Sequence, residues 1–132
     1  MKLKGKRLFI TGGAGFIGSH FIERVIDENE VTVFDNLDRD ALKFTSLQNH
    51  KNLKLVQGDI LDIDALEKSM NQADIVIHMA AIAGVSTVVS KPTTTLKINL
   101  LGSYNVLEAC RKNNVKRYIG FSTSEVYGPF IY

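Results

Sequence analysis

Short apolar runs alternate with amphipathic stretches along the whole chain. Between the runs, apolar residues recur at helical spacing, most clearly at Ile17, Phe21 and Val25. The runs themselves have the length and β-branched content of strands; they are RLFIT (residues 7–11), EVTVFD (30–35), LKLVQGD (53–59), ADIVIHMAA (73–81) and VKRYIGFST (115–123). This alternation predicts a parallel sheet with helices packed against it.

The other intervals predict further helices. A weak helical pattern covers residues 40–48, and DIDALEKSMN begins with two aspartates, Asp62 and Asp64, either of which can cap a helix. A long helix is expected at residues 94–113. Right-handed crossovers between such units favour a doubly wound, Rossmann-like α/β fold with strand order 3-2-1-4-5. A ligand would then bind at the carboxyl ends of strands one and four.

The long helix is more apolar than packing on a sheet requires. A helix that covers a sheet needs one apolar stripe. Here the apolar residues occupy more than one face; they are Leu96, Ile98, Leu100, Leu101, Tyr104, Val106, Leu107, Ala109 and Cys110. The second face must therefore meet either more of the protein's own chain or another subunit.

Length and composition limit the class of protein. The chain has 132 residues, which suits one domain, with 45% hydrophobic and 23% charged residues, as in a globular fold. A net charge of +2 without a basic block argues against a nucleic-acid partner. The single Cys110 predicts a reducing, cytoplasmic location. Neither a secretory signal nor an apolar run near the roughly 18 residues of a membrane span is present, so no membrane association is expected. No metal site is expected either.

The first candidate binding motif is TGGAGFIGSH, residues 11–20, where the first predicted strand ends and the first predicted helix begins. Gly12, Gly15 and Gly18 fit a dinucleotide-binding turn, although their spacing is Gly-x-x-Gly-x-x-Gly rather than Gly-x-Gly-x-x-Gly. The first glycine permits the tight turn, the second lets the backbone approach a pyrophosphate, and the third lets the helix pack closely. A glycine-rich turn without a ligand remains the alternative. A Walker loop is excluded because no Gly-Lys-Ser/Thr follows.

Asp35 ends the second predicted strand, twenty residues after Gly15. A carboxylate at this place can accept hydrogen bonds from the adenosine ribose and would repel a 2′-phosphate. The predicted cofactor is therefore NAD rather than NADP, although Arg39 nearby leaves NADP open. The simpler alternative is that Asp35 only begins the turn DNLD.

Six stretches, taken in order, resemble the extended short-chain dehydrogenase/reductase family, in its branch of nucleotide-sugar epimerases, dehydratases and decarboxylases. They are TGGAGFIGSH, VFDN, GDI, HMAAIAG, INLLGSYNVLEAC and FSTSEVYG, and they run the whole length of the chain. The resemblance implies that residues 1–132 form the NAD-binding domain of an enzyme that acts on a nucleoside-diphosphate sugar. It also implies transient oxidation at sugar C4 and a homodimer.

The resemblance assigns cofactor-binding roles to several residues. The backbone N–H groups of Phe16 and Ile17 would bind the pyrophosphate, and Asn36 would join Asp35 on the ribose. Asp59 would accept a hydrogen bond from the adenine amino group, with Ile60 packed against the ring.

Four further residues would lie against the cofactor or order the site, again by resemblance. Met79, Ala80 and Ala81 would pass beneath the cofactor, because their side chains leave room for it against the backbone. Asn99 would order the active site by hydrogen bonding. Its alternative is an ordinary polar residue of a helix.

The motif STSEVYG resembles the catalytic strand of the family. Thr123 would hydrogen-bond the sugar oxygen that is oxidised, while Ser124 and Glu125 would assist the later proton or carboxylate chemistry. A hydrophilic turn after the fifth strand is the alternative for Ser124 and Glu125.

One family feature is missing. The family's base is a tyrosine followed four positions later by a lysine, and no Tyr-x-x-x-Lys occurs in the 132 residues. We therefore expect the amino-terminal part of such an enzyme, which binds NAD weakly and is inactive alone. A non-catalytic dinucleotide-binding module and a fragment that dimerises through the long helix are the other hypotheses.

Overall fold

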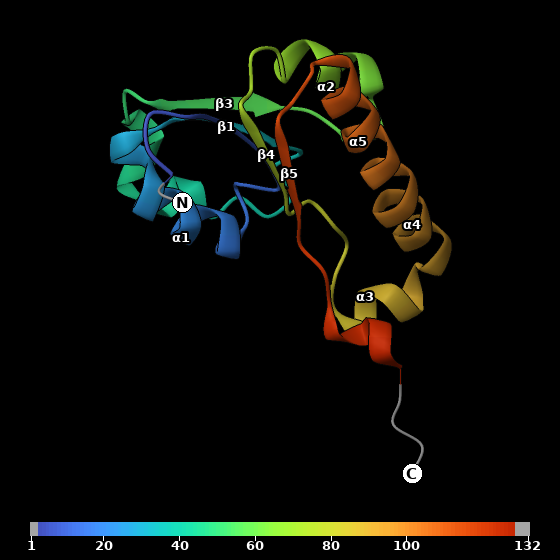
Figure 1. The fold of residues 1–132 in the computed structure, drawn as a ribbon. Coiled ribbons are helices and arrows are strands. Elements are labelled where there is room, and N and C mark those ends of the chain that lie inside the picture. Colours follow the sequence, from blue (N-terminus) through green and yellow to red (C-terminus); the bar gives the residue numbers. More distant parts are fainter. Residues whose placement is uncertain (1–2, 129–132) are drawn as a thin grey trace.

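The computed structural model describes residues 3–128 and shows a five-stranded parallel sheet with helices on both faces (Figure 1). The strands lie in the order β3-β2-β1-β4-β5, which confirms the predicted fold and strand order. Their bounds are β1 (Arg7–Thr11), β2 (Glu30–Asp35), β3 (Leu53–Gln57), β4 (Ile75–His78) and β5 (Arg117–Gly120). The first two coincide with the predicted runs, while the other three are shorter.

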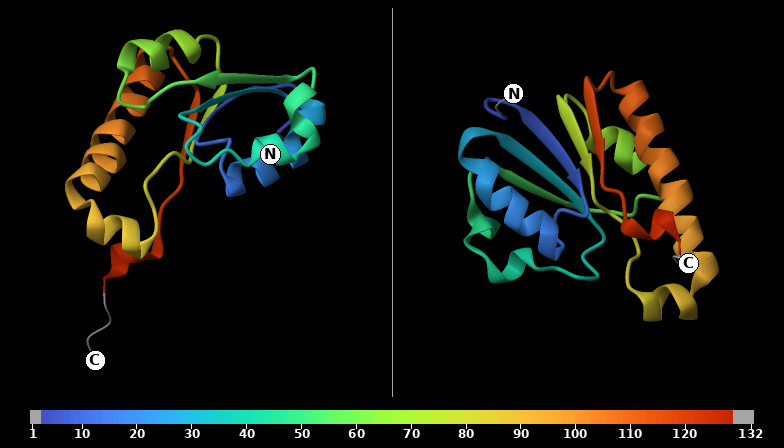
Figure 2. Two further views of the ribbon diagram at one scale, coloured as in Figure 1. Left: turned by 180° about the vertical axis from the view of Figure 1, so that it is seen from behind. Right: turned by 60° about the horizontal axis from the view of Figure 1, so that its bottom comes forward.

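Alternate residues of β1 serve two separate cores, because successive side chains of a strand point to opposite faces. Ile10 packs in the core beneath helix α1 (Phe16–Val25). Phe9 packs on the other face, in the core covered by α2 (Ile63–Ser69) and α5 (Ser103–Lys112). The two layers of helices on either side of the sheet are visible in Figure 2. Both cores therefore meet at the central strand.

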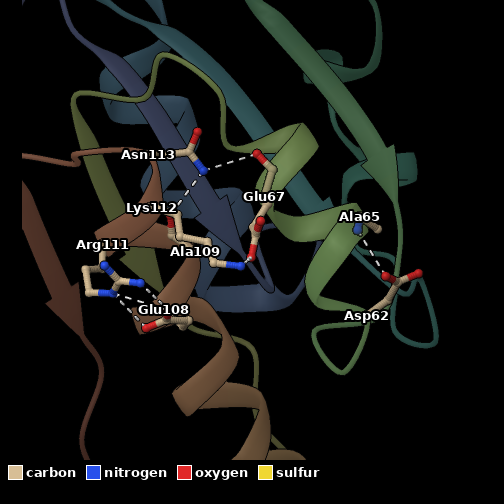
Figure 3. Close-up of polar contacts among 8 residues, drawn as sticks. All are labelled: Asp62, Ala65, Glu67, Glu108, Ala109, Arg111, Lys112 and Asn113. Carbon is tan, nitrogen blue, oxygen red and sulfur yellow. Dashed lines mark hydrogen bonds and ion pairs between the residues drawn. The ribbon is translucent and has the colours of Figure 1, made fainter.

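Helices α2 and α5 lie side by side and are joined at their ends (Figure 3). Asp62, the first of the two predicted caps, begins α2 by accepting a hydrogen bond at 3.0 Å from the N–H of Ala65. At the end of α5, the Lys112 ammonium lies 2.6 Å from the Glu67 carboxylate, and the Asn113 amide donates to the Glu67 carbonyl at 3.1 Å. The ion pair is solvent-exposed and adds little stability, so apolar packing holds the two helices together.

The predicted long helix is observed as one helical arm with an unexpected segment inside it. The arm begins with α4 (Pro92–Leu96), continues as a π-helical segment (Lys97–Gly102) and ends as α5. Proline at the start is favourable because its missing N–H has no helical partner there. A separate short helix, α3 (Val85–Ser90), precedes the arm and was not predicted.

The interval predicted as a weak helix, residues 40–48, forms two 3₁₀ turns instead. They are Leu42–Phe44 and Ser46–Asn49. Thr45 between them is extended, and its hydroxyl accepts a hydrogen bond from the N–H of Leu47. A continuous α-helix is thereby interrupted, while Leu42 and Leu47 still enter the core.

The second apolar face of the arm is exposed in the described part of the chain. Val106 and Ala109 are buried against the sheet. On the other face, large apolar side chains remain accessible; they are Leu96, Leu100, Leu101, Tyr104 and Leu107. The predicted second face is thus present, and no described residue covers it. Within residues 3–128, no helix has the length and apolar character needed to cross a membrane.

Candidate functional site

The glycine turn between β1 and α1 packs its backbone directly on other backbone. Gly12 has φ +70°, and a Cβ added to it would lie 2.5 Å from the amide nitrogen of Ala80 in the loop after β4. A Cβ on Gly18 would lie 2.6 Å from the Cα of Gly13. Gly12 therefore serves the tight turn, and Gly18 the close packing of α1, as the sequence predicted for each.

The start of α1 is the part of this turn that suits an anion. Gly15 caps the helix in an extended conformation without a side-chain acceptor, and no acidic residue lies in the first turn. A Cβ on Gly15 would meet only the carbonyl oxygen of Gly12, at 3.3 Å. Phe16 and Ile17, which follow, are 74% and 59% exposed. The first N–H groups of a helix have no partner within it and carry partial positive charge, so this end fits a pyrophosphate.

Asp35 lies at the carboxyl end of β2 and is tied to the same turn. Its side chain accepts hydrogen bonds from the N–H of Ala14 at 3.0 Å and from the N–H of Leu37 at 2.9 Å. It is only 8% exposed, and this burial raises the pKa of the carboxyl group against the lowering effect of the two N–H donors. Each carboxylate oxygen has a second lone pair, so the group can still accept ribose hydroxyls.

The other residues predicted for the adenosine end have local roles in this structure. Asn36 exchanges hydrogen bonds with Asp38, through its Oδ1 at 3.1 Å and its Nδ2 at 2.9 Å. Asp59 accepts from the N–H of Leu61 at 2.9 Å and is exposed. Ile60 is 6% exposed and packs beneath the π-helical segment. Contact of these residues with a cofactor stays a prediction.

Asn105, which is not among the predicted site residues, supports the turn at Asp59–Leu61. Its buried amide donates to the carbonyl oxygens of Ile60 at 3.1 Å and Leu61 at 3.2 Å. The sequence offers one indication of this role: Asn105 is an amide residue on the same face of α5 as the buried Ala109. Asn105 thereby fixes the end of β3 against the helical arm.

The loop after β4 is held closely against β1. The N–H of Met79 donates to the carbonyl oxygen of Thr11 at 3.0 Å, and the N–H of Ala80 reaches the Thr11 hydroxyl at 3.4 Å. Because Gly12 lies against the same Ala80, the glycine turn and this loop form one continuous surface of backbone.

Asn99, in the π-helical segment, anchors the other end of that loop. Its side-chain oxygen accepts from the N–H of Ile82 at 2.8 Å, and its side-chain nitrogen donates to the carbonyl of Ile82 at 2.9 Å. Ala81 remains exposed between the two anchors. Asn99 thus holds this loop by hydrogen bonding, and its role in ordering an active site stays a prediction.

The predicted catalytic residues follow β5. The N–H of Phe121 donates to the carbonyl of His78 at 3.0 Å, which extends the pairing of β5 with β4 toward Thr123. Ser124 begins the 3₁₀ turn Ser124–Tyr127, which lies on the side of α3 and α4, away from α1 (Figures 1 and 2). The side chain of Glu125 lies outside the described part of the structure. The catalytic roles of these residues stay a prediction.

Two surface hollows of about 150 and 160 Å³ lie at the opposite edge of the sheet. Their linings include Arg7, Glu30 and Arg117, at the amino ends of the strands. Ligands of doubly wound sheets bind outside the carboxyl ends of the strands. The geometry therefore favours the glycine-turn edge as the site.

Known proteins are similar to this chain in sequence and in fold. The family model described as "NAD dependent epimerase/dehydratase family" matches residues 8–131. The chain belongs to this family. The Bacillus cytotoxicus UDP-N-acetyl-alpha-D-glucosaminuronate decarboxylase is 40% identical over 124 residues, which are 93% of this chain and 38% of the relative. The Mycobacterium tuberculosis dTDP-glucose 4,6-dehydratase is 36% identical, over 92% of this chain and 38% of its own.

Solved structures give the same result. The UDP-N-acetylglucosamine 4-epimerase from Methanobrevibacter ruminantium, in complex with UDP-N-acetylmuramic acid, has a TM-score of 0.88 and 41% identity over 95% of this chain and 40% of that one. The Bordetella bronchiseptica enzyme WbmH, in complex with NAD+, has a TM-score of 0.82 and 32% identity over 93% and 40%. The resemblance to extended short-chain dehydrogenases is thus confirmed, with NAD as the cofactor of the family. The chain spans about two fifths of the length of these relatives.

Proposed function

We propose that this chain is the NAD-binding part of a nucleotide-sugar epimerase or dehydratase. One observation carries the proposal: the start of α1 at Gly15, which has no side-chain cap, lies beside a turn that the buried Asp35 carboxylate holds through Ala14. The N–H groups at the start of α1 suit a pyrophosphate, and the Asp35 carboxylate suits the adjoining ribose. The decarboxylase, the dehydratase and the UDP-N-acetylglucosamine 4-epimerase named above have nucleoside-diphosphate sugars in their names, which supports the substrate class.

In the proposed reaction, bound NAD would accept a hydride from sugar C4 and return it to the sugar later in the same cycle. The N–H groups of Phe16 and Ile17 hold the pyrophosphate, and the Met79–Ile82 loop forms the surface on which the cofactor rests. Thr123 donates to or accepts from the sugar oxygen at the oxidised carbon. Ser124 and Glu125 assist the proton or carboxylate step that decides the product.

For the 132 residues alone, we propose weak NAD binding without turnover. The sequence holds no Tyr-x-x-x-Lys, the pair expected to supply the base for sugar oxidation. The same absence favours the second candidate, a dinucleotide-binding module without chemistry. The presence of FSTSEVYG favours the enzyme, because a binding module has no need of a catalytic strand.

Calorimetric titration of the chain with NAD and with NADP tests the cofactor assignment. Heat of binding is expected for NAD, and weaker or no binding for NADP, because the Asp35 carboxylate repels a 2′-phosphate. Equal affinities, or a preference for NADP, would contradict the assignment. Turnover is tested separately by adding UDP-sugars with NAD and following the sugar nucleotides by ¹H NMR, because a transient oxidation returns the hydride and leaves no net reduced nicotinamide. Catalytic turnover by the chain alone would contradict the proposal that it is inactive.

We also propose that the exposed face of the helical arm forms a homodimer contact. Its support is the row of accessible side chains that includes Leu96, Leu100 and Leu107 on a helix whose other face is already buried. A contiguous apolar surface of this kind is typical of an interaction site.

A further inference from the structure

His78, the last residue of β4, bridges the two residues that anchor the following loop. Its Nδ1 lies 2.6 Å from the hydroxyl of Thr11, and its Nε2 lies 2.9 Å from the hydroxyl of Ser103. Thr11 holds the loop at Ala80, and Ser103 bonds the backbone of Asn99, which holds the loop at Ile82. The imidazole of His78 therefore connects the two anchors of the loop in one hydrogen-bond network.

The direction of each hydrogen bond in this network follows from which groups have a proton to donate. The Ser103 hydroxyl oxygen is 2.6 Å from the carbonyl oxygen of Asn99, so the hydroxyl proton lies between these two oxygens. Ser103 then has no proton left for the imidazole, and His78 must donate from Nε2. In a neutral imidazole, Nδ1 is consequently unprotonated and accepts a hydrogen bond from the hydroxyl of Thr11. The Thr11 oxygen in turn accepts from the N–H of Ala80.

The surroundings of the His78 imidazole favour its neutral form. His78 is 6% exposed, and burial lowers the pKa of its imidazole. The groups that face it from the neighbouring elements are the two hydroxyls and the ring of Tyr118 on β5, at 6.2 Å between centroids. No charged group among the described residues adds to that pKa shift.

We propose that His78 is a positioning residue that fixes the shape of the Met79–Ile82 loop. It does so in one tautomer, with the proton on Nε2, by joining Thr11 to Ser103 and, through Ser103, to Asn99. The five hydrogen-bonding groups then run in one direction, from the N–H of Ala80 to the carbonyl of Asn99. The importance of this loop for the cofactor rests on the proposed function. The hydrogen-bond order itself rests only on the geometry.

The first test is spectroscopic and needs neither a variant nor NAD. Two-dimensional ¹⁵N–¹H correlation of the imidazole rings distinguishes the two neutral tautomers and the cation. His78 is expected to remain the Nε2–H tautomer from about pH 6 to 8, the range in which ordinary histidines titrate. An Nδ1–H tautomer, or protonation of His78 within that range, would overturn the proposal.

Two substitutions then separate the two ends of the bridge. His78→Gln places an amide nitrogen toward Ser103, so the resonances of the Asn99 side-chain amide should remain while that of the Ala80 N–H shifts. His78→Asn places an oxygen toward Thr11 and should give the reverse. Identical changes at both ends in both variants, or none, would overturn the bridge.

Ser103→Ala removes the hydroxyl that links His78 to Asn99. Amide exchange at Ile82 should accelerate about tenfold, the factor expected from the loss of one hydrogen bond. Ser90→Ala is the matched control, because Ser90 also bonds a carbonyl of its own helix, that of Thr87 at 3.2 Å, with no histidine contact. Equal effects of Ser103→Ala and Ser90→Ala would overturn the role of Ser103. Because these readouts are recorded without cofactor, their failure is distinct from a failure to bind NAD.

Discussion

The carboxylate of Asp35 is hydrogen-bonded at 3.0 Å to the backbone N–H of Ala14, which joins the end of β2 to the middle of the glycine turn. The predicted ribose ligand is therefore also a structural part of the predicted pyrophosphate site. A change at Asp35 will alter both the charge presented to the ribose and the shape of the turn, and the two effects have to be separated experimentally.

Asp35→Ala and Asp35→Asn separate these effects on NAD binding. Alanine loses both hydrogen bonds and leaves the N–H groups of Ala14 and Leu37 without their acceptor, which costs about 1–3 kcal/mol of stability per unsatisfied group. Asparagine keeps one acceptor oxygen and removes the charge. We expect both variants to weaken NAD binding by calorimetry and to narrow the preference for NAD over NADP, because both remove the charge. Asparagine leaves one of the two N–H groups without an acceptor rather than both, so it should lose less thermal stability than alanine. Unchanged NAD affinity in Asp35→Ala would remove Asp35 from the site.

The buried charge of Asp35 predicts a pH dependence of stability. Burial raises its pKa in the folded state above the ordinary value of 3.8, so the folded protein binds this proton more tightly than the unfolded chain does. Its contribution to the free energy of unfolding is therefore fully present below pH 3.8 and declines as the pH rises through the raised pKa. Urea unfolding of the wild type and of Asp35→Asn across this range should show their difference falling with pH. A difference that rises would contradict the direction of the shift.

Gly12→Ala and Gly15→Ala should affect different properties. At Gly12, φ is +70° and the added Cβ would lie 2.5 Å from the Ala80 nitrogen, so backbone would have to move. We expect a loss of about 2 kcal/mol or more in urea unfolding. At Gly15 the backbone is extended, and the nearest atom to the Cβ is the Gly12 carbonyl oxygen at 3.3 Å, a tight contact that a small shift relieves, so the loss of stability should be smaller, below about 1 kcal/mol.

The same pair of variants tests the ligand. Because the Cβ of Gly15→Ala would occupy space at the start of α1, NAD affinity should fall in a protein that remains folded. Retained affinity in this variant would place the pyrophosphate elsewhere.

The sheet could be predicted from the sequence because its strands are short apolar runs that alternate with amphipathic stretches. Helix α3 could not, because Val85, Val88 and Val89 are β-branched residues typical of strands. Local features bound this helix, which begins after Gly84 at φ +102° and ends at Ser90, shortly before Pro92, and none of its residues is buried.

The candidate site was predicted as a set of positions but not as a network. The glycines and Asp35 follow from their spacing along the chain. The pairing of Thr11 with His78 joins residues 67 positions apart, and that of Asn105 with Ile60 joins residues 45 positions apart. Such pairs depend on how the strands and the helical arm pack, for which no local pattern exists.

Dimer formation through the helical arm is tested by Leu100→Glu. Leu100 is 67% exposed, so a charge there should not disturb the core, whereas it would be buried at a helix–helix contact. Removing one leucine from such a contact costs about 1.5–3 kcal/mol, which corresponds to a tenfold or greater rise in the dimer Kd. Light scattering at matched concentrations should show a dimer for the wild type and a monomer for the variant.

Phe44→Glu is the control for this experiment. Phe44 is 83% exposed and lies in a 3₁₀ turn on the α1 side of the sheet, away from the arm. The same change of an apolar side chain to glutamate should leave the dimer intact there. A wild-type chain that is monomeric at high concentration would contradict the proposed contact, and so would a dimer that Phe44→Glu dissociates as well as Leu100→Glu does.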